Sequence, residues 1–239
     1  MTIQNREKNS KKIERLQFGF SMDNWRRYMK SKLSRHIVSN VLEVGSGVGS
    51  TANTFYDESI KSWTSIEPNI KLYKQMEKNQ KKGLISKNIK LSNCYLNETN
   101  KTKFNTIMYI DVLEHIENDK YEVKIASSKI QNNGKIIILC PAYNFLYSRL
   151  DYSVGHYRRY TKDQLFNLFD KEKFELQGFY LDSIGIIANL LNKYLIKSSS
   201  PTKIQYFIFN YLIIPISIVT DKLFNYSFGR SVVVIAKKN

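Results

Sequence analysis

Apolar runs alternate with amphipathic stretches through most of the chain. Runs typical of strands lie at residues 41–44, 62–67, 89–92, 104–110 and 135–140. Stretches with helix-compatible spacing lie at residues 25–38, 51–56, 70–82, 119–131 and 162–169. Strands buried on both faces have continuous apolar sequences, and helices between them allow neighbouring strands to run parallel. The alternation therefore predicts an α/β fold with a doubly wound, mostly parallel sheet.

The regular alternation ends near residue 174. Residues 174–184 and 231–238 both have strand patterns, and we expect them to pair as an antiparallel hairpin, which gives a sheet of seven strands. They are separated by residues 185–230, a stretch far longer than a hairpin loop. This insert is apolar and helical in pattern, and SSSPTK predicts a break between two helices.

The length of 239 residues is sufficient for one well-buried α/β domain and short for two. We expect a single domain over residues 1–239. It comprises an N-terminal helical segment at 1–38, a core at 39–184 and 231–239, and the apolar helical insert or cap at 185–230.

The chain is strongly basic, with 37 Lys and Arg against 21 Asp and Glu and a net charge of +16. Such a surface attracts phosphates, which favours a nucleic acid or an anionic membrane as partner. However, 28 of the 37 basic residues are lysines, and solvated lysines scattered along helices explain the charge equally well. Charge alone therefore leaves the partner open.

Two features bear on the compartment. The two cysteines, Cys94 and Cys140, lie in or beside apolar strand-like runs, which is typical of reduced structural thiols in a cytosolic protein. The N-terminus is polar and lacks the apolar core of a secretory signal. The spacing of the metal-binding residue types predicts no metal site.

The longest apolar stretch, residues 204–220, is interrupted by Gln205, Asn210 and Pro215. It falls short of the roughly 18 to 20 clean apolar residues of a spanning helix, so we expect a buried or interfacial element.

The segment VLEVGSGVGS, residues 41–50, joins the first strand to a helix through a glycine-rich turn. Ser50 stands where the dinucleotide pattern G-x-G-x-x-G needs its third glycine. The carboxylate of Glu43 would repel a pyrophosphate but suits a ligand with a cationic end, such as S-adenosylmethionine. Glu67 follows Gly47 by twenty residues at the next strand end, where a carboxylate can bind both ribose hydroxyls.

With these features the chain resembles the class I S-adenosylmethionine-dependent methyltransferases. The resemblance rests on VLEVGSGVGS, on SIEPN and on FNTIMYIDVLEHIEND, and it covers most of residues 41–161. It implies the Rossmann-like fold of that family and S-adenosylmethionine as cofactor. Asn93 stands where the family usually has an acidic adenine-binding residue, and its amide oxygen can still accept from the adenine amine. The implied cofactor-binding residues are Glu43, Gly45, Ser46, Gly47, Gly49, Glu67, Pro68, Asn93, Cys94, Tyr95, Ile110 and Asp111.

The segment DYSVGHYRRYT, residues 151–161, follows the fifth strand and is expected to be a loop that leads into a helix. Thr161 and Gln164 form a capping-box pattern, which assigns the end of the segment a structural role. Arginine pairs suit phosphate or carboxylate, and an imidazole suits proton removal near neutral pH. The structural alternative is that an arginine braces a carboxylate such as Asp151 and that the histidine only bonds a backbone carbonyl.

From these properties we predict an acceptor site and a catalytic base. The candidate base is His156, followed by His115 and Asp111, the latter at the carboxyl end of the fourth strand. The predicted acceptor-binding residues are Tyr143, His156, Arg158 and Arg159.

The GHYRRYT segment and the closing FGRSVVVIAKK also resemble a bacterial subset of class I methyltransferases encoded among surface-polysaccharide genes. This resemblance implies methyl transfer to an oxygen or nitrogen of a small or sugar-type acceptor, phosphorylated or lipid-linked, in cell-surface glycan biosynthesis. It implies a cytoplasmic enzyme at the inner face of the membrane, with peripheral membrane association. The alternative is a methyltransferase or binding protein for RNA or another nucleic acid, but the motifs of the DNA amino-group and cytosine C5 enzymes are missing.

Overall fold

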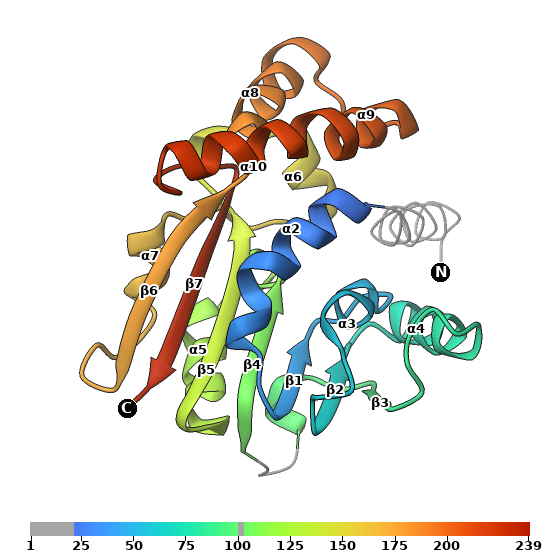
Figure 1. The fold of residues 1–239 in the computed structure, drawn as a ribbon, viewed down its shortest axis with the longest axis vertical. Coiled ribbons are helices and arrows are strands. Elements are labelled where there is room, and N and C mark those ends of the chain that lie inside the picture. Colours follow the sequence, from blue (N-terminus) through green and yellow to red (C-terminus); the bar gives the residue numbers. More distant parts are fainter. Residues whose placement is uncertain (1–21, 100–102) are drawn as a thin grey trace.

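A computed structural model describes residues 22–99 and 103–239. In these residues one sheet lies between two layers of helices (Figure 1). The strands are β1 (Asn40–Val44), β2 (Ser62–Ile66), β3 (Ile89–Ser92), β4 (Phe104–Ile110), β5 (Ile130–Pro141), β6 (Phe174–Leu181) and β7 (Ser231–Lys238). Their order in the sheet is β3-β2-β1-β4-β5-β7-β6. The first five pair in parallel, whereas β7 is antiparallel to both β5 and β6. The predicted seven-stranded sheet is confirmed.

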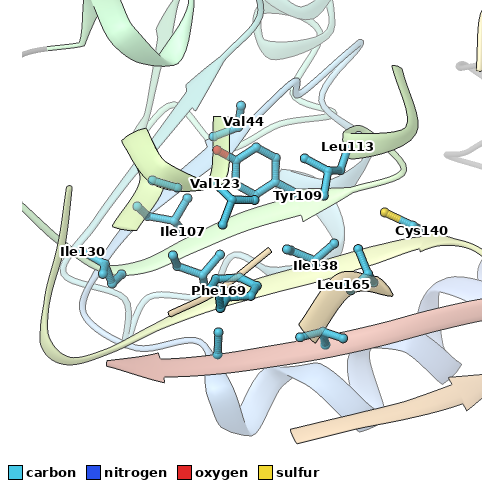
Figure 2. Packing of buried hydrophobic residues seen from close by; sticks show 14 of the residues in the cluster. Val44, Ile107, Tyr109, Leu113, Val123, Ile130, Ile138, Cys140, Leu165 and Phe169 are labelled. Carbon is cyan, nitrogen blue, oxygen red and sulfur yellow. The ribbon is translucent and has the colours of Figure 1, made fainter. Parts of the chain in front are cut away.

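Alternate residues along each strand bury opposite faces of the sheet. On one face Ile107, Tyr109 and Ile138 pack against α5 (Asp119–Lys129) and α7 (Lys162–Phe166), as Figure 2 shows in part. On the other face, strand residues such as Met108 and Leu139 pack against a second group of helices. These are α2 (Asp23–Leu33), α3 (Ser50–Phe55), α4 (Ile70–Lys81) and α10 (Ile214–Leu223). The burial of both faces explains why the strands have continuous apolar sequences.

Two local expectations were wrong in part. The helix expected at 25–38 is α2 followed by a 3-10 turn, Ser34–His36, and residues 1–21 of the predicted N-terminal segment lie outside the described residues. The start of the expected loop is helical, since α6 (Arg149–Val154) contains its first four residues. Ser148 and Asp151 form the capping box of α6, and Gly155 ends it with a left-handed φ of 85°.

The insert before β7 is helical, as predicted. It contains α8 (Ser183–Leu191), a π-helical turn (Asn192–Ile196), α9 (Lys203–Ile208), a second π-helical turn (Phe209–Ile213) and α10. The break between α8 and α9 coincides with the SSSPTK segment. In Figure 1 these helices lie together beyond the ends of β1, β4 and β5, which are the carboxyl ends of the parallel strands.

Asp221 anchors the insert to the domain. Its buried carboxylate accepts hydrogen bonds from the Tyr28 hydroxyl at 2.6 Å and from the backbone amides of Asp182 and Ser183 at 2.6 and 2.8 Å. These contacts join α10 to α2 and to the end of β6, so the insert has a fixed place above the carboxyl edge of the sheet.

Candidate active site

The glycine turn after β1 has a left-handed backbone at each of its glycines. Gly45, Gly47 and Gly49 have φ angles of 67°, 58° and 90°. A side chain at Gly45 would meet Val112 at 2.7 Å, and one at Gly49 would meet Ile85 at 2.1 Å. Gly49 is also the N-cap residue of α3. The three glycines therefore bend the chain from β1 into α3 in a path that residues with side chains would strain.

Glu43 is buried next to this turn. Its Oε2 accepts hydrogen bonds from the Ser65 hydroxyl at 2.6 Å and the Trp63 indole at 3.1 Å, whereas Oε1 has no hydrogen-bond partner among the described residues. Burial raises the pKa of Glu43 to about 7, although the hydrogen bonds from Ser65 and Trp63 act in the opposite direction. The carboxylate thus braces β1 against β2, and Oε1 is available for the predicted contact with a cationic ligand.

Replacing Glu43 with glutamine should change how stability depends on pH. In the wild type the folded protein keeps a proton, up to a pKa of about 7, that the unfolded chain releases near 4.5, so stability falls as pH rises between these values. The difference corresponds to about 2 to 3 kcal/mol between pH 5 and pH 8. Urea denaturation at both pH values should show a loss that is larger in the wild type than in Glu43→Gln by this amount, because other buried acids such as Glu114 also have a raised pKa in both proteins. An equal loss in both proteins would contradict the assignment.

Glu67 and Asn93 lie beside the glycine turn at the ends of β2 and β3. Glu67 Oε2 accepts from the Gly47 amide at 2.9 Å, which holds the turn against β2. Asn93 donates through Nδ2 to the backbone oxygens of Glu67 and Pro68 at 2.7 and 3.1 Å, so its amide oxygen is oriented away from them. This orientation agrees with its predicted role as an acceptor for adenine.

The other residues of the adenine segment face in different directions. Tyr95 is 63% exposed, whereas the Cys94 thiol approaches the Ser92 hydroxyl at 3.4 Å and packs against the core on the α5 face. Ser46 is buried and donates to backbone oxygens of Glu43 and Ile66. The structure thus gives Ser46 and Cys94 structural contacts, and their cofactor roles stay predictions.

Asp111 follows Ile110 at the carboxyl end of β4. Its φ of 54° is left-handed, and its amide donates to Leu139 at 2.8 Å, which extends the ladder with β5. The side chain is accessible to solvent. Loss of hydration within the surrounding protein raises the pKa of Asp111, while the neighbouring side chains of His156, Arg230 and Arg159 lower it. Asp111 therefore lies between the glycine turn and the GHYRRYT segment.

Asp151 organises the GHYRRYT segment. It is 1% exposed, and its carboxylate accepts from Arg159 Nε and Nη2 at 2.8 and 3.0 Å, from His156 Nδ1 at 2.8 Å and from the Ser148 amide at 2.9 Å. Burial alone would raise the pKa of Asp151, but the hydrogen bonds of His156 and Arg159 outweigh it and hold the pKa well below its usual value. Asp151 is therefore an ionised residue that holds Ser148, His156 and Arg159 together.

Both arginines bind oxygen atoms of the protein itself. Arg159 is 5% exposed and bound to Asp151, so its predicted contact with an acceptor is replaced by a bracing contact. Arg158 donates to Asp119 and to the Glu117 carbonyl, both at 2.7 Å, and is partly exposed. Tyr143 stacks between Phe145 and Tyr180, with ring centroids 5.4 and 5.1 Å away. Of these residues, Arg158 and Tyr143 keep some access to solvent.

His115 and His156 lie together. Their rings meet edge to face with centroids 4.6 Å apart. His115 Nδ1 lies 3.1 Å from the Gly155 carbonyl oxygen, which is the backbone contact expected as the alternative for His156. His156 instead bonds a carboxylate, and its Nε2 lies 3.8 Å from Oε1 of the buried Glu114.

Asp151 and Glu114 were not identified as site residues in the sequence. For Asp151 a signal was present, because Ser148-x-x-Asp151 is a helix-capping pattern. Glu114 precedes His115 inside DVLEHI, but its approach to His156 depends on packing between segments about forty residues apart. In the structure His115 and His156 lie together, Asp111 is close enough to interact electrostatically with His156, and the carboxylates of Asp151 and Glu114 join them. The catalytic roles of Asp111, His115 and His156 stay predictions.

Similarity to known proteins agrees with this geometry. A family model described as a methyltransferase domain matches residues 4–178. The plantazolicin methyltransferase BpumL, solved in complex with SAH, has a TM-score of 0.62 and 12% identity, covering 99% of this chain and 91% of its own. A SAM-dependent methyltransferase from Archaeoglobus fulgidus has a TM-score of 0.55 and 20% identity, covering 89% and 94%. The YcgJ protein of Bacillus subtilis has a TM-score of 0.56 and 14% identity, covering 87% and 95%.

No curated protein matches the sequence. The match to the family model covers well over half of the 239 residues, and the seven-stranded sheet agrees with it. The chain belongs to the methyltransferase domain family and has the Rossmann-like fold of S-adenosylmethionine-dependent methyltransferases.

Proposed function

We propose that this enzyme transfers a methyl group from S-adenosylmethionine to an oxygen or nitrogen of a sugar-type acceptor, carried on phosphate or lipid, in cell-surface glycan biosynthesis. The observation that carries the proposal is the pair His156 and Asp151, 2.8 Å apart, close to Asp111 at the carboxyl edge of the sheet. In open α/β sheets this edge is where ligands bind.

The residues around the glycine turn fit the cofactor. The turn and Glu67 would hold the methionine and ribose parts, and the orphan Oε1 of Glu43 would accept from the amino group. The cofactor supplies an electrophilic methyl carbon on a positively charged sulfur. Acceptor placement next to this carbon gives most of the rate, because positioning is worth roughly 7 to 11 kcal/mol at best.

His156 is suited to take the acceptor's proton. Asp151 accepts from Nδ1, which fixes the ring and leaves the lone pair on Nε2. Nε2 would accept the proton that the acceptor atom loses when it is methylated. Arg159 takes no part in this step, but it holds Asp151 ionised and in place.

The insert supports an acceptor at a membrane. Its helices leave large apolar side chains uncovered between Ile187 and Phe228, and Leu195, Phe207 and Val219 are 73%, 63% and 67% exposed. Residues 183–220 include three lysines and no acidic residue. The helical run Lys203–Leu223 is, by length and composition, apolar enough to cross a membrane, but only 28% of its apolar window is buried. It packs on α2, α8 and β6, so we propose that the insert lies on the surface of an anionic bilayer at the inner face of the membrane.

This surface predicts binding to vesicles. The protein should co-sediment with vesicles that contain phosphatidylglycerol and less with pure phosphatidylcholine, because its lysines add electrostatic attraction. Leu195→Glu and Phe207→Glu should each weaken binding about tenfold or more, since each removes one large apolar contact. Ile70→Glu on α4, which is 48% exposed, is the matched control and should bind normally. Wild-type binding in all variants, or light scattering that shows a stable dimer through this face, would contradict the prediction.

The function itself is tested in two stages. Calorimetry with S-adenosylhomocysteine establishes whether the cofactor site exists, and labelled S-adenosylmethionine then reports methyl transfer to nucleotide sugars, sugar phosphates, lipid-linked sugars, small amines and RNA. We expect label in a sugar-type acceptor. Label in RNA, with binding that weakens steeply with salt, would replace this proposal by the nucleic-acid alternative.

A further inference from the structure

We propose that Glu114, His115 and His156 form a binding site for one divalent metal ion of the first transition row. One ligand atom from each residue lies within 4.8 Å of the others. Small shifts of these side chains would bring the three atoms to the distances of roughly 2.0 to 2.2 Å at which nitrogen and carboxylate oxygen bind such ions. Only the role of the metal in methyl transfer rests on the proposed function, because metal binding can be measured by itself.

The strongest support is the carboxylate of Glu114. It is 0% exposed, and neither Oε1 nor Oε2 accepts a hydrogen bond of good geometry from the part of the chain that the structure describes. The buried Cys140 thiol lies beside it, but a thiol is a weak donor. Burying an ionised carboxylate without a partner costs several kcal/mol, so such a group holds either a proton or a cation. His156 Nε2 lies 3.8 Å from Oε1, which directs the carboxylate toward the histidines.

His156 presents Nε2 to the Glu114 carboxylate, and a ring nitrogen of His115 belongs to the same cluster. His115 Nδ1 is 3.1 Å from the Gly155 carbonyl oxygen, and His156 Nδ1 is 2.8 Å from Asp151 Oδ1. A carbonyl and a carboxylate can only accept, so each Nδ1 carries the proton and each Nε2 carries the lone pair. Metal-binding histidines are held in this way, with the second nitrogen donating to a carboxylate or a backbone carbonyl.

The backbone fixes the two segments against each other. The Tyr157 amide donates to the Glu114 carbonyl at 2.8 Å, and the Tyr147 hydroxyl donates to the His156 carbonyl at 2.6 Å. The loop that contains His156 is therefore joined directly to the turn that contains Glu114 and His115. The donor atoms are brought together by folding, which is why the sequence spacing predicts no metal site.

Two imidazoles and one carboxylate favour Mn²⁺, Fe²⁺, Co²⁺ or Zn²⁺ over Mg²⁺ and Ca²⁺, which prefer oxygen ligands. Three protein ligands leave positions open for an acceptor hydroxyl, and Asp111 is close enough to act electrostatically on Glu114. A metal ion there would lower the pKa of the acceptor hydroxyl, whose proton would pass to solvent water before the oxygen attacks the methyl carbon. His156 would then be a metal ligand, and the acceptors would be alcohols or diols that bind through oxygen.

The test is a titration of the chelator-treated full-length protein with Co²⁺, followed by visible absorption and by calorimetry. We expect one equivalent to bind, and Glu114→Gln or His115→Gln to weaken that binding by more than about 100-fold, since loss of a supporting residue alone costs about 10- to 100-fold. Glu114→Gln keeps the shape of the side chain and removes its charge. His36→Gln is the matched control, because His36 is also buried and contacts Arg35 instead of this cluster. Mg²⁺ should compete poorly.

Co²⁺ binding that is missing in the wild type, or unchanged in Glu114→Gln, would overturn the proposal. Loss of binding in His36→Gln would do the same, because it would place the metal elsewhere. Affinity for S-adenosylhomocysteine shows that each variant is folded and separates the two proposals. Co²⁺ binding without cofactor binding would leave the metal site standing and remove the proposed function, whereas full methyl transfer in chelator would leave the proposed function standing and remove the catalytic role of the metal.

Discussion

Replacing Asp151 with alanine is expected to lower the free energy of unfolding by about 3 to 5 kcal/mol. The substitution leaves the guanidinium of Arg159 buried at 5% exposure without its carboxylate, and an uncompensated buried charge is among the most destabilising changes in a protein. It also removes the acceptor of the Ser148 amide, which begins α6. Urea denaturation of wild type and variant measures the difference.

Removing the partner charge as well should restore part of this loss. In the double variant Asp151→Ala, Arg159→Met no buried charge is left unpaired, so the loss should be smaller than the sum of the single losses. The exposed pair Asp170 and Lys173 provides the control, and Asp170→Ala should change stability little. If the losses of unfolding free energy from the Asp151 and Arg159 substitutions were strictly additive, the contact between the two side chains would not contribute to stability.

The second large effect concerns turnover. His156→Gln is expected to lower kcat by about 10²- to 10⁴-fold while the affinity for S-adenosylhomocysteine stays almost unchanged. His156 faces Glu114 and the bound Asp151, whereas the predicted cofactor residues surround the glycine turn. Steady-state kinetics and calorimetry on the same preparations provide the comparison, with His36→Gln as the control.

A loss of cofactor affinity as large as the loss of turnover would contradict the assignment of His156 to the acceptor site. If a metal ion occupies the site, the same substitution removes a ligand, and the Co²⁺ titration distinguishes that role from proton transfer. Both roles need Nε2 as a lone-pair donor, which Asp151 provides by accepting from Nδ1.

Much of the fold could be predicted because local sequence determines it. Strands with two buried faces have continuous apolar runs, so the seven strands and the antiparallel pairing of β6 with β7 followed from the pattern. Helix α6 could not be read in the same way, because it is six residues long and its only fully enclosed side chain is that of Asp151. A buried aspartate reads as a polar surface position until its partner is known.

The site residues also differ in how far local sequence determines their positions. The glycine turn and Glu67 were predicted because their spacing along a strand-turn-helix unit fixes where they lie. The approach of Glu114 to His156 depends on contacts between distant segments, about which sequence spacing gives no information. The contact of Arg159 with Asp151 lies within one segment, and the sequence left it open as the structural alternative. The arginine residue type suggested that both side chains bind an anionic acceptor. In the folded chain they bind carboxylates of the protein, Asp151 and Asp119.

The place of β7 has a consequence for synthesis of the chain. Residues 231–238 pair with β5 on one side and β6 on the other, so those two strands cannot join until residues 231–238 have left the ribosome. The apolar helices of residues 183–223 emerge earlier, while the sheet is still open between β5 and β6. During that interval the nascent chain exposes both an unpaired strand edge and an apolar surface, which are the features that chaperones bind and that drive aggregation. Early contact of the insert with a lipid surface would shield the second of them.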